Sequence, residues 1–396
     1  MRIAIVGSGV SGLVAAHRLS ARNDVTLFEA ADTPGGHAHT VPVETPAGSV
    51  GVDVGFMVFN HDTYPLFTSL LDELGVSSRA TSMTFSVRED RTGREWRGAS
   101  PRFWADMIRF NRASRELLSG EADPDYALGD FLKKTGISAG FRDDLIVPMG
   151  SAVWSADPEM FTEMPAHTFV QFFANHRALH LRRPQWRTVV GGSRSYVDAI
   201  SARLGSRLRT SCPIASISRD DDGVELVDHR GRREFFDVVV MATHSDQALD
   251  LLVDAEPVEK EVLGDIRYQT SRAVLHTDGT HLPRSRRLRA AWNFHVPERP
   301  AAGPTVTYDL KALQGLPIDG EMLLSLNREV DPAKSLQEFD FAHPVFDRAA
   351  ISAQRRKPEI QGVNRTWYCG AYWGYGFHED GIRSAADVCA DLERLG

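Results

Sequence analysis

Apolar and polar positions follow a recognisable order over the first 30 residues of the chain. The apolar run Arg2–Val6 predicts a buried strand, and a glycine-rich turn follows it at Gly7–Gly12. A helix is expected to begin near Ser11, and Val25–Glu29 predicts the next strand. Strand, tight turn, helix and strand in this order predict a βαβ unit with parallel strands.

The middle of the chain changes to a helical pattern. Val52–Phe59 is an apolar run that predicts one more strand, and residues 83–87 and 95–97 predict a hairpin. Helical periodicity then covers residues 101–120, 127–134 and 163–178, the last with a break at Pro165. The region from about Asn60 to Gln185 is therefore predicted to be mainly helical and to form a cap.

Strand patterns return after Gln185. A helix is predicted over 196–204, and strands are predicted from Trp186 and over 208–219, 223–228, 234–241, 271–276, 305–310, 321–327 and 365–370. The last helix is predicted from about Asp380 to Leu395. We therefore expect an α/β protein with two discontinuous domains. A Rossmann-like domain comprises residues 1–60, 186–246 and 359–396, and an inserted α+β substrate domain comprises 61–185 and 247–358.

The first turn carries the spacing of a dinucleotide-binding site. Gly7 allows the tight turn, Gly9 lets the backbone approach a pyrophosphate, and Gly12 lets the helix lie close to the strand. The phosphates would sit on the free N–H groups at the start of the helix near Ser11. Glu29 follows Gly9 by twenty residues, where an acidic side chain accepts hydrogen bonds from ribose hydroxyls.

A second glycine turn decides which dinucleotide is expected. Gly35 and Gly36 follow the second strand, and a domain that binds only NAD does not need them. They offer a second backbone approach to the same pyrophosphate, as in FAD proteins of the glutathione-reductase type, which this segment resembles. FAD is therefore the predicted cofactor.

Composition narrows the class of protein. The chain has 396 residues, 42% of them hydrophobic, and a net charge of −8, which gives no reason to expect nucleic acid as a partner. Three widely spaced cysteines suggest neither a disulfide framework nor a metal site. The first strand begins at Arg2, so we expect no signal peptide and a cytoplasmic location.

Several segments together resemble the flavin-containing amine oxidase and phytoene desaturase superfamily. They are the two glycine turns, Asp53–Phe56, Gly191–Ser193, Pro213–Ile217 and Gly370–Ser384. Within it the chain is most similar to a bacterial family of predicted FAD-binding proteins, through runs such as Val54–Asn60 and Gly370–Gly381. The resemblance implies an amine-oxidase-like fold and FAD contacts from Gly7, Ser8, Gly9, Ser11, Gly12, Glu29, Gly36, Gly55, Ile214, Gly370, Gly376, Phe377, Gly381 and Ile382. Ile214 would lie near the adenine, and Gly55 and Gly376–Ile382 near the flavin.

The chain also departs from that pattern. His37 stands where amine oxidases usually carry an arginine that binds the pyrophosphate, and Gly370–Ala371 replaces the usual glycine and acid. Only six of the 45 basic residues are lysines, and none lies in a motif that assigns it to the flavin. The lysine count weakens the interpretation as an amine oxidase.

The aromatic run before the last helix supplies the candidate catalytic residues. His378 is a candidate proton acceptor because its ordinary pKa lies near neutrality, and Glu379 and Tyr375 are its neighbours. The alternative is that His378 and Glu379 bind backbone groups at the entry of the last helix. The aromatic side chains either pack or form a substrate cage.

The predicted cap helices suggest the substrate class. Apolar residues around Phe103–Phe110, flanked by arginines, indicate either core packing or an apolar tunnel with contact to the inner face of a membrane. The resembled family often occurs beside methyltransferases that are similar to cyclopropane-fatty-acid synthase, which implies a fatty-acyl or phospholipid substrate and a lipid methyltransferase as partner. We expect an FAD-dependent desaturation of such a substrate. The alternatives are a double-bond isomerase, an amine oxidase, and a non-catalytic flavoprotein partner of the methyltransferase.

Overall fold

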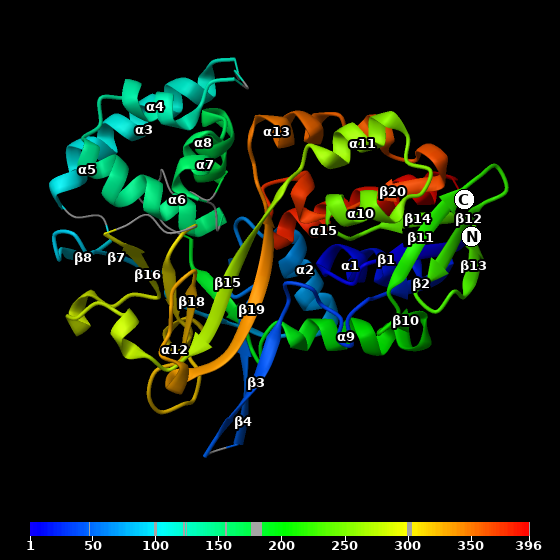
Figure 1. Ribbon diagram of the computed structural model, residues 1–396, viewed down its shortest axis with the longest axis horizontal. Coiled ribbons are helices and arrows are strands. Elements are labelled where there is room, and N and C mark those ends of the chain that lie inside the picture. The colour runs from blue at the N-terminus through cyan, green and yellow to red at the C-terminus, as the bar shows by residue number, and fades with distance from the viewer. Residues whose placement is uncertain are drawn as a thin grey trace.

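The computed structural model describes residues 1–46, 48–98, 101–121, 123, 125–154, 157–175, 184–298 and 303–395. Figure 1 shows two parts, a layered α/β part that holds both termini and a second part with a large sheet and a lobe of helices. The last three residues of the predicted helix 163–178 lie outside the described residues.

A five-stranded parallel sheet forms the centre of the α/β part. Its strands, in spatial order, are β10 (Leu208–Arg209), β2 (Asp24–Phe28), β1 (Arg2–Val6), β14 (Val238–Met241) and β20 (Thr366–Tyr368). Three segments far apart in the sequence thus supply one sheet, as the strand pattern predicts. The side chains of Ile3–Val6 and Val238–Met241 are buried on both faces, which explains why these runs in β1 and β14 are apolar throughout.

Helices cover one face of this sheet, and a second layer covers the other. The first face packs against α1 (Val10–Leu19), α2 (Pro65–Leu74), α9 (Arg194–Leu204) and α15 (His378–Leu395). The opposite layer contains α10 (Ser245–Leu251), α11 (Pro257–Gly264), α13 (Arg348–Arg355), α14 (Lys357–Ile360) and the antiparallel strands β11 (Ile214–Arg219), β12 (Val224–Asp228) and β13 (Arg233–Phe236).

A seven-stranded sheet forms the centre of the second part. In spatial order it contains β19 (Ser335–Pro344), β15 (Tyr268–His276), β18 (Leu323–Leu326), β17 (Val306–Asp309), β16 (Trp292–Val296), β7 (Phe85–Glu89) and β8 (Glu95–Arg97). Figure 1 shows β15 and β19 side by side along the boundary between the two parts. The predicted hairpin is confirmed, because β7 pairs with β8.

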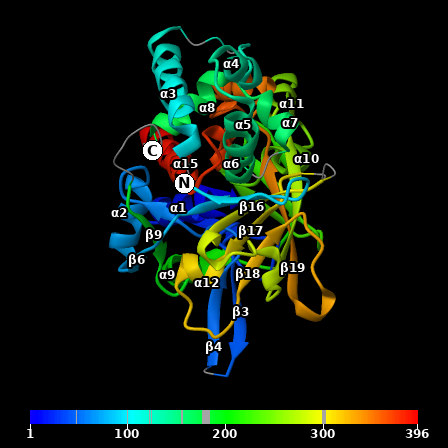
Figure 2. The ribbon, with the colours of Figure 1, turned by 90° about the vertical axis from the view of Figure 1, so that its left-hand side faces the viewer.

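The helical lobe lies at one end of this sheet (Figure 2). It contains α3 (Trp104–Ser119), α4 (Leu128–Lys134), α5 (Ala139–Phe141), a π-helical turn (Arg142–Ile146), α6 (Val147–Trp154), α7 (Pro158–Thr162) and α8 (Ala166–Asn175). The remaining elements are strands β3 (Thr40–Thr45), β4 (Gly48–Asp53), β5 (Phe59–Asn60), β6 (Ser78–Ala80) and β9 (Trp186–Val189), helix α12 (Leu310–Gln314), and 3₁₀ turns at Pro101–Phe103, Gly205–Arg207, Gly279–His281, Arg286–Leu288, Pro332–Lys334, Val363–Arg365 and Ala371–Trp373.

Three predicted strands are corrected by the structure. Val52–Phe59 is not one strand, because β4 ends at Asp53 and β5 begins at Phe59, with a turn at Gly55 between them. The predicted strands 208–219 and 234–241 each divide between two sheets. The region between Asn60 and Gln185 is mainly helical as predicted, but it also contains β6 and β7, which pair with strands from elsewhere, and β8, which pairs with β7.

Candidate functional site

The first glycine turn has the geometry that its spacing predicts. Gly7 has a φ of +98°, and a Cβ there would lie 2.8 Å from the carbonyl oxygen of Ala242. A Cβ on Gly12 would lie 1.9 Å from the carbonyl oxygen of Gly7. A Cβ on Gly9 would meet no atom within 4 Å, so this residue faces open space at the start of α1. Two of the glycines therefore serve packing, and Gly9 keeps a surface clear for a ligand.

The second glycine turn lies directly against the first. A Cβ on Gly36 would lie 3.2 Å from the Cα of Gly9, and the N–H of Gly35 donates to the carbonyl oxygen of Ser8 at 3.0 Å. Residues 7–9 and 35–36 thus form one cradle of bare backbone, which fits a pyrophosphate. The two turns converge as the sequence predicts.

Glu29 ties this cradle to the end of the second strand. Its Oε2 accepts from the backbone N–H of Ser8 at 2.9 Å and from the Ser8 hydroxyl, and its Oε1 accepts from the N–H of Ala31. A carboxylate retains further lone pairs, so the ribose contact expected of Glu29 is compatible with these bonds. Ile214 lies near this end, because the N–H of Cys212, two residues earlier, donates to the Glu29 carbonyl oxygen.

The start of α15 lies against the start of α1. A Cβ on Gly381 would lie 2.8 Å from the Ser11 hydroxyl oxygen and 2.9 Å from a methyl carbon of Val10. Ile382 is fully buried beneath this contact. The positive ends of two helices therefore meet at one place, which favours an anionic ligand. Gly381 and Ile382, for which the resemblance implies flavin contacts, thus lie beside the first turn of α1.

Gly55 and Gly376 also occupy positions where a side chain would not fit. A Cβ on Gly55 would lie 2.2 Å from the carbonyl oxygen of His37, which accepts from the N–H of Phe56. Gly376 has a φ of +89°, and a Cβ there would lie 3.1 Å from the ring of Phe346. These glycines connect the cradle to the aromatic loop before α15.

The structure gives His378 a packing role. Its ring stacks on Phe56 with a centroid distance of 3.6 Å, and its Nε2 hydrogen-bonds the hydroxyl of Tyr196 at 2.8 Å. Burial lowers its pKa to about 3, which makes the imidazole a weak base at neutral pH. The geometry therefore argues against His378 as the proton acceptor, because its ring is enclosed and partnered.

Glu379 forms hydrogen bonds that fit neither of the two expected roles, a proton acceptor or a cap at the entry of its own helix. Its two carboxylate oxygens accept from the backbone N–H groups of Leu66 and Phe67, each at 3.0 Å. These groups belong to the first turn of α2, whose own N-cap, Tyr64, supplies no side-chain hydrogen bond. Glu379 thus caps a neighbouring helix across 312 residues of sequence. This arrangement argues against a role as catalytic base.

Asp380 holds the aromatic loop and is a residue that the sequence motifs did not single out. Its Oδ2 accepts from the backbone N–H groups of Tyr375 and Phe377, each at 3.1 Å. Burial raises the pKa of Asp380 to about 6. Asp53 is a similar case, because burial raises its pKa to about 6 while it accepts from the N–H of Ser193 and the hydroxyl of Thr40. Both buried carboxyls fix loops that surround the cradle.

Aromatic side chains of the helical lobe pack onto that loop. Phe377 stacks on Phe172 of α8 at 5.0 Å, and the Tyr375 ring lies 5.7 Å from the Phe172 ring. The Nε1 of Trp154 in α6 donates to the carbonyl oxygen of Tyr375 at 3.1 Å. Tyr375 and Phe377 are only partly buried. The flavin end of the predicted site therefore meets the lobe through an aromatic wall, which comprises Trp154, Phe172, Tyr375 and Phe377.

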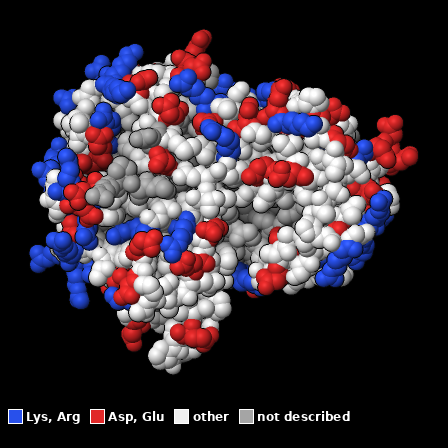
Figure 3. Space-filling model, viewed as in Figure 1, with Lys and Arg blue, Asp and Glu red and all other residues white. Residues whose placement is uncertain are grey.

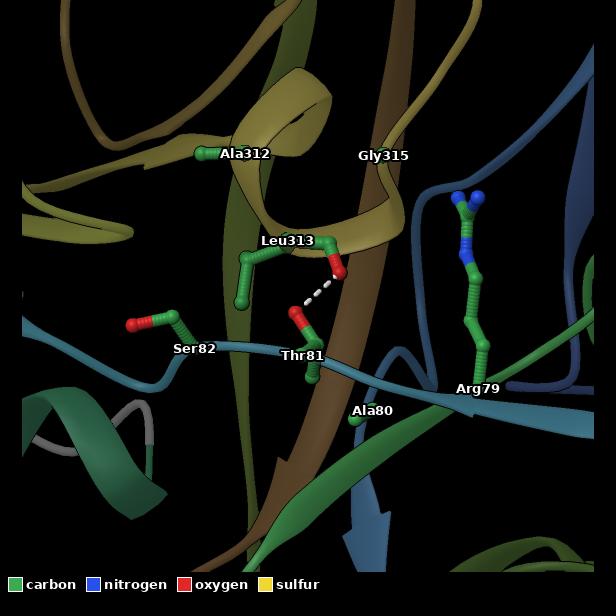
Figure 4. Close-up of a pocket in the computed structure, with 7 residues that line it drawn as sticks. All are labelled: Arg79, Ala80, Thr81, Ser82, Ala312, Leu313 and Gly315. Carbon is green, nitrogen blue, oxygen red and sulfur yellow. Dashed lines mark hydrogen bonds between the residues drawn. The ribbon is translucent and has the colours of Figure 1, made fainter.

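Two surface pockets lie away from the cradle. One has a volume of about 340 Å³ and lies between residues 79–82 and the end of α12, with the Arg79 side chain at its edge (Figure 4). The second, of about 430 Å³, lies between α2 and strand β9. Neither includes a residue of the two glycine turns. Acidic and basic side chains are interspersed over the face shown in Figure 3.

Three histidines come together beside the cradle, which sequence spacing did not reveal. The ring of His37 lies 5.2 Å from that of His343 and 6.2 Å from that of His244.

The described part of the chain contains no cluster of His, Cys, Asp and Glu able to hold a metal ion. It also contains no helix with the length and apolarity to cross a membrane.

Comparison with known proteins agrees with this geometry. The family model described as flavin containing amine oxidoreductase matches residues 10–275. A structure of wild-type putrescine oxidase bound to putrescine superposes with a TM-score of 0.74 at 14% identity, covering 100% of this chain and 99% of the other. The CLA-producing fatty acid isomerase from P. acnes gives 0.75 at 17%, covering 99% and 98%. Cyclohexylamine oxidase from Brevibacterium oxydans IH-35A gives 0.71 at 18%, covering 99% of each chain.

Proposed function

This chain belongs to the family of flavin containing amine oxidoreductases, and on that premise we propose that it dehydrogenates an apolar, fatty-acyl substrate. FAD is its cofactor, held by the two glycine turns, Glu29 and the start of α15. When bound, FAD supplies the hydride acceptor, and the protein supplies binding, orientation and electrostatics. The double bond would form or become conjugated in the acyl chain.

The observation that carries the proposal is the aromatic wall. Trp154 and Phe172 belong to the core of the helical lobe, and they contact the loop of Tyr375 and Phe377 that leads into α15. A substrate that reached the flavin from this side would meet ring faces and edges. Such surfaces bind hydrocarbon chains through the burial of apolar area.

The acidic residues next to this wall support the same substrate class. Glu379 is committed to the N-terminus of α2, and Asp380 to the backbone of the aromatic loop.

Lys357, the lysine nearest Gly370 in the sequence, contacts the Ser384 hydroxyl and the Trp373 ring. Its pKa is lowered by burial, and it lies on the α15 side of the loop beside Asp387 and Asp391. An amine oxidase is therefore the less favoured function.

A double-bond isomerase is the second candidate. The CLA-producing fatty acid isomerase has the same fold as this chain, which supports an acyl substrate for both. The engagement of His378 and Glu379 favours isomerisation, because a hydride that leaves the acyl chain and returns to it requires neither a base nor an external electron acceptor. Dehydrogenation instead needs a group or solvent that takes the second hydrogen as a proton.

Anaerobic spectroscopy of the yellow holoprotein tests the proposal. A vesicle of phospholipid with unsaturated acyl chains should bleach the flavin absorbance, whereas putrescine should not. Phe172→Leu should weaken this response at low lipid concentration, and Phe235→Leu, at an exposed residue of β13, should not change it. Product formation without any electron acceptor would select the isomerase. Bleaching by amines and not by lipids would refute the acyl proposal.

An exposed patch on α3 supports contact with a membrane surface. Trp104 and Ile108 lie one helical turn apart with 66% and 70% of their surface exposed, which is unusual for large apolar residues. Arg112 is 82% exposed on the same helix and suits anionic head groups. Replacing Trp104 and Ile108 by Ser should abolish cosedimentation with anionic vesicles. Undiminished cosedimentation would refute the contact, and copurification with a lipid methyltransferase tests the remaining partner proposal.

A further inference from the structure

Three histidines beside the cradle have no role in the chemistry described above. His37 directly follows Gly36, His244 follows strand β14, and His343 lies near the end of β19. The three histidines lie near the edge of the parallel sheet where the strands have their carboxyl ends. In α/β proteins the ligand binds in a crevice at this edge. Ala242, two residues before His244, lies next to the first glycine turn, because a Cβ on Gly7 would lie 2.8 Å from its carbonyl oxygen. The cluster therefore borders the place where the phosphates sit.

Two ring nitrogens of this cluster are buried without a hydrogen-bond partner. They are the Nε2 of His37 and the Nδ1 of His343. A buried polar atom without a partner destabilises the folded state, so native proteins rarely retain one without a reason. The backbone of His37 is fixed between Gly36 and Phe56, and its side chain lies among His343, His244 and Phe341. These two ring nitrogens without hydrogen-bond partners thus belong to residues next to the cradle of bare backbone.

The groups that face these imidazoles leave them neutral. Burial lowers the pKa of His37 below its usual value, and the neighbouring His343, His244, His378 and His39 lower it further. The pKa of His343 falls to about 4 for the same two reasons, burial and His244. The carboxylate of Asp246 acts on His244 and opposes the lowering of its pKa, whereas Arg194 acts on His39 and lowers its pKa. A nearby diphosphate would act in the opposite direction on His37, because a negative charge favours the protonated ring.

We propose that this histidine cluster captures a proton when the FAD diphosphate binds, so that His37 becomes the cation that an arginine would otherwise supply. The binding step joins FAD, the neutral protein and one proton, and no bond is broken. The proton resides on the imidazole whose Nε2 lacks a partner, and the new N–H donates toward the phosphates. This inference rests on FAD as cofactor and goes beyond it by assigning a proton-linked anion site.

The cofactor affinity of the apoprotein at two pH values tests the inference. One captured proton weakens binding by up to about tenfold for each unit of pH increase between the pKa of His37 in the free protein and its higher pKa in the complex. We expect FAD to bind at least about tenfold more weakly at pH 8 than at pH 6, measured by quenching of flavin fluorescence. Calorimetry in buffers of different ionisation enthalpy should show proton uptake on binding. The flavin ring and its diphosphate do not titrate in this range.

Variants separate the cluster from other sources of pH dependence. His37→Arg should bind FAD with little dependence on pH, and His37→Gln should bind weakly at both pH values without proton uptake. His343→Gln provides a second variant in case substitution at His37 prevents folding, and it should reduce the uptake. His61→Gln, at an exposed histidine, should behave as wild type.

The outcomes distinguish this inference from the proposed function. Equal FAD affinity at pH 6 and pH 8 in the wild type, or proton uptake that persists in both His37→Gln and His343→Gln, would overturn the inference and leave the oxidoreductase assignment intact. Failure of the folded wild-type protein to bind FAD at either pH would overturn both. Proton uptake that disappears in His37→Gln and persists in His61→Gln would confirm the assignment.

Discussion

Replacement of Glu379 by Gln distinguishes a structural role from a catalytic one. The wild-type carboxylate accepts two backbone N–H groups at the start of α2, both at 3.0 Å, and its side chain is only 5% exposed. A glutamine keeps one acceptor oxygen but turns an NH₂ group toward the second N–H. Leu66 or Phe67 is then left with a buried donor that has no partner.

The expected loss follows from these two bonds. A hydrogen bond to a charged group contributes about 1.5–3 kcal/mol, and the interaction of the carboxylate with the helix dipole adds about 0.5 kcal/mol. Losing one bond and weakening the other should lower the free energy of unfolding by about 2–3 kcal/mol. Glu393→Gln, at an exposed position of the same helix, should change it by less than about 0.5 kcal/mol.

Urea unfolding of both apoproteins, followed by circular dichroism, measures this difference. At 25 °C without denaturant, Glu379→Gln should still bind FAD and show the wild-type flavin spectrum, because the substituted side chain faces α2. The reasoning is refuted if Glu379→Gln unfolds at the same urea concentration as Glu393→Gln. Flavin reduction abolished at full stability would instead assign chemistry to Glu379.

Two further predictions concern the glycine turn and the buried histidines of the large sheet. Gly9→Ala should fold normally, because φ at this residue is −60° and no atom lies within 4 Å of the new Cβ, yet it should bind FAD at least about tenfold more weakly. Gly12→Ala should fail to fold, because its Cβ would lie 1.9 Å from the carbonyl oxygen of Gly7. An FAD content of purified Gly9→Ala equal to that of the wild type would contradict this account. Burial lowers the pKa of His276 to about 4, against about 6.5 in the unfolded chain, so the unfolded state binds more protons and stability falls as the pH drops from 6.5 to 4. His276→Gln should reduce this loss in urea titrations at pH 7 and pH 5, and an unchanged pH dependence would show that other groups cause it.

The glycine turns could be predicted from the sequence because their requirements are local. A positive φ at Gly7 and a close approach at Gly12 concern residues within one turn and its adjacent strand, and the motif spacing encodes them. The convergence of Gly36 with Gly9 followed from chain order and from the resemblance. The apolar runs Ile3–Val6 and Val238–Met241 could be recognised because both faces of the sheet are covered there, but the strand pattern joined β10 to β11 and β13 to β14, which lie in different sheets.

The roles of polar side chains could not be predicted in this way. Glu379 binds residues 312 and 313 positions away, and Tyr196, the partner of His378, lies 182 positions away. An argument from helix capping looks within one helix, so the alternative to a catalytic role placed Glu379 at the entry of α15 and did not consider α2. The break of the predicted strand 52–59 was hidden for a related reason. Gly55 turns because it approaches the His37 carbonyl oxygen, and that contact joins separate segments.

Four consecutive residues at the start of α15 hold four different elements. His378 bonds Tyr196 of α9, Glu379 caps α2, Asp380 holds the backbone of the aromatic loop, and Gly381 contacts α1. Each requirement restricts a different position, so architecture alone explains an unusual run of titratable residues beside the flavin end. The consequence for function concerns the position of the aromatic loop. A loop anchored at this junction keeps Tyr375 at a fixed place relative to the cradle, and substrate orientation can contribute to hydride transfer without a dedicated base.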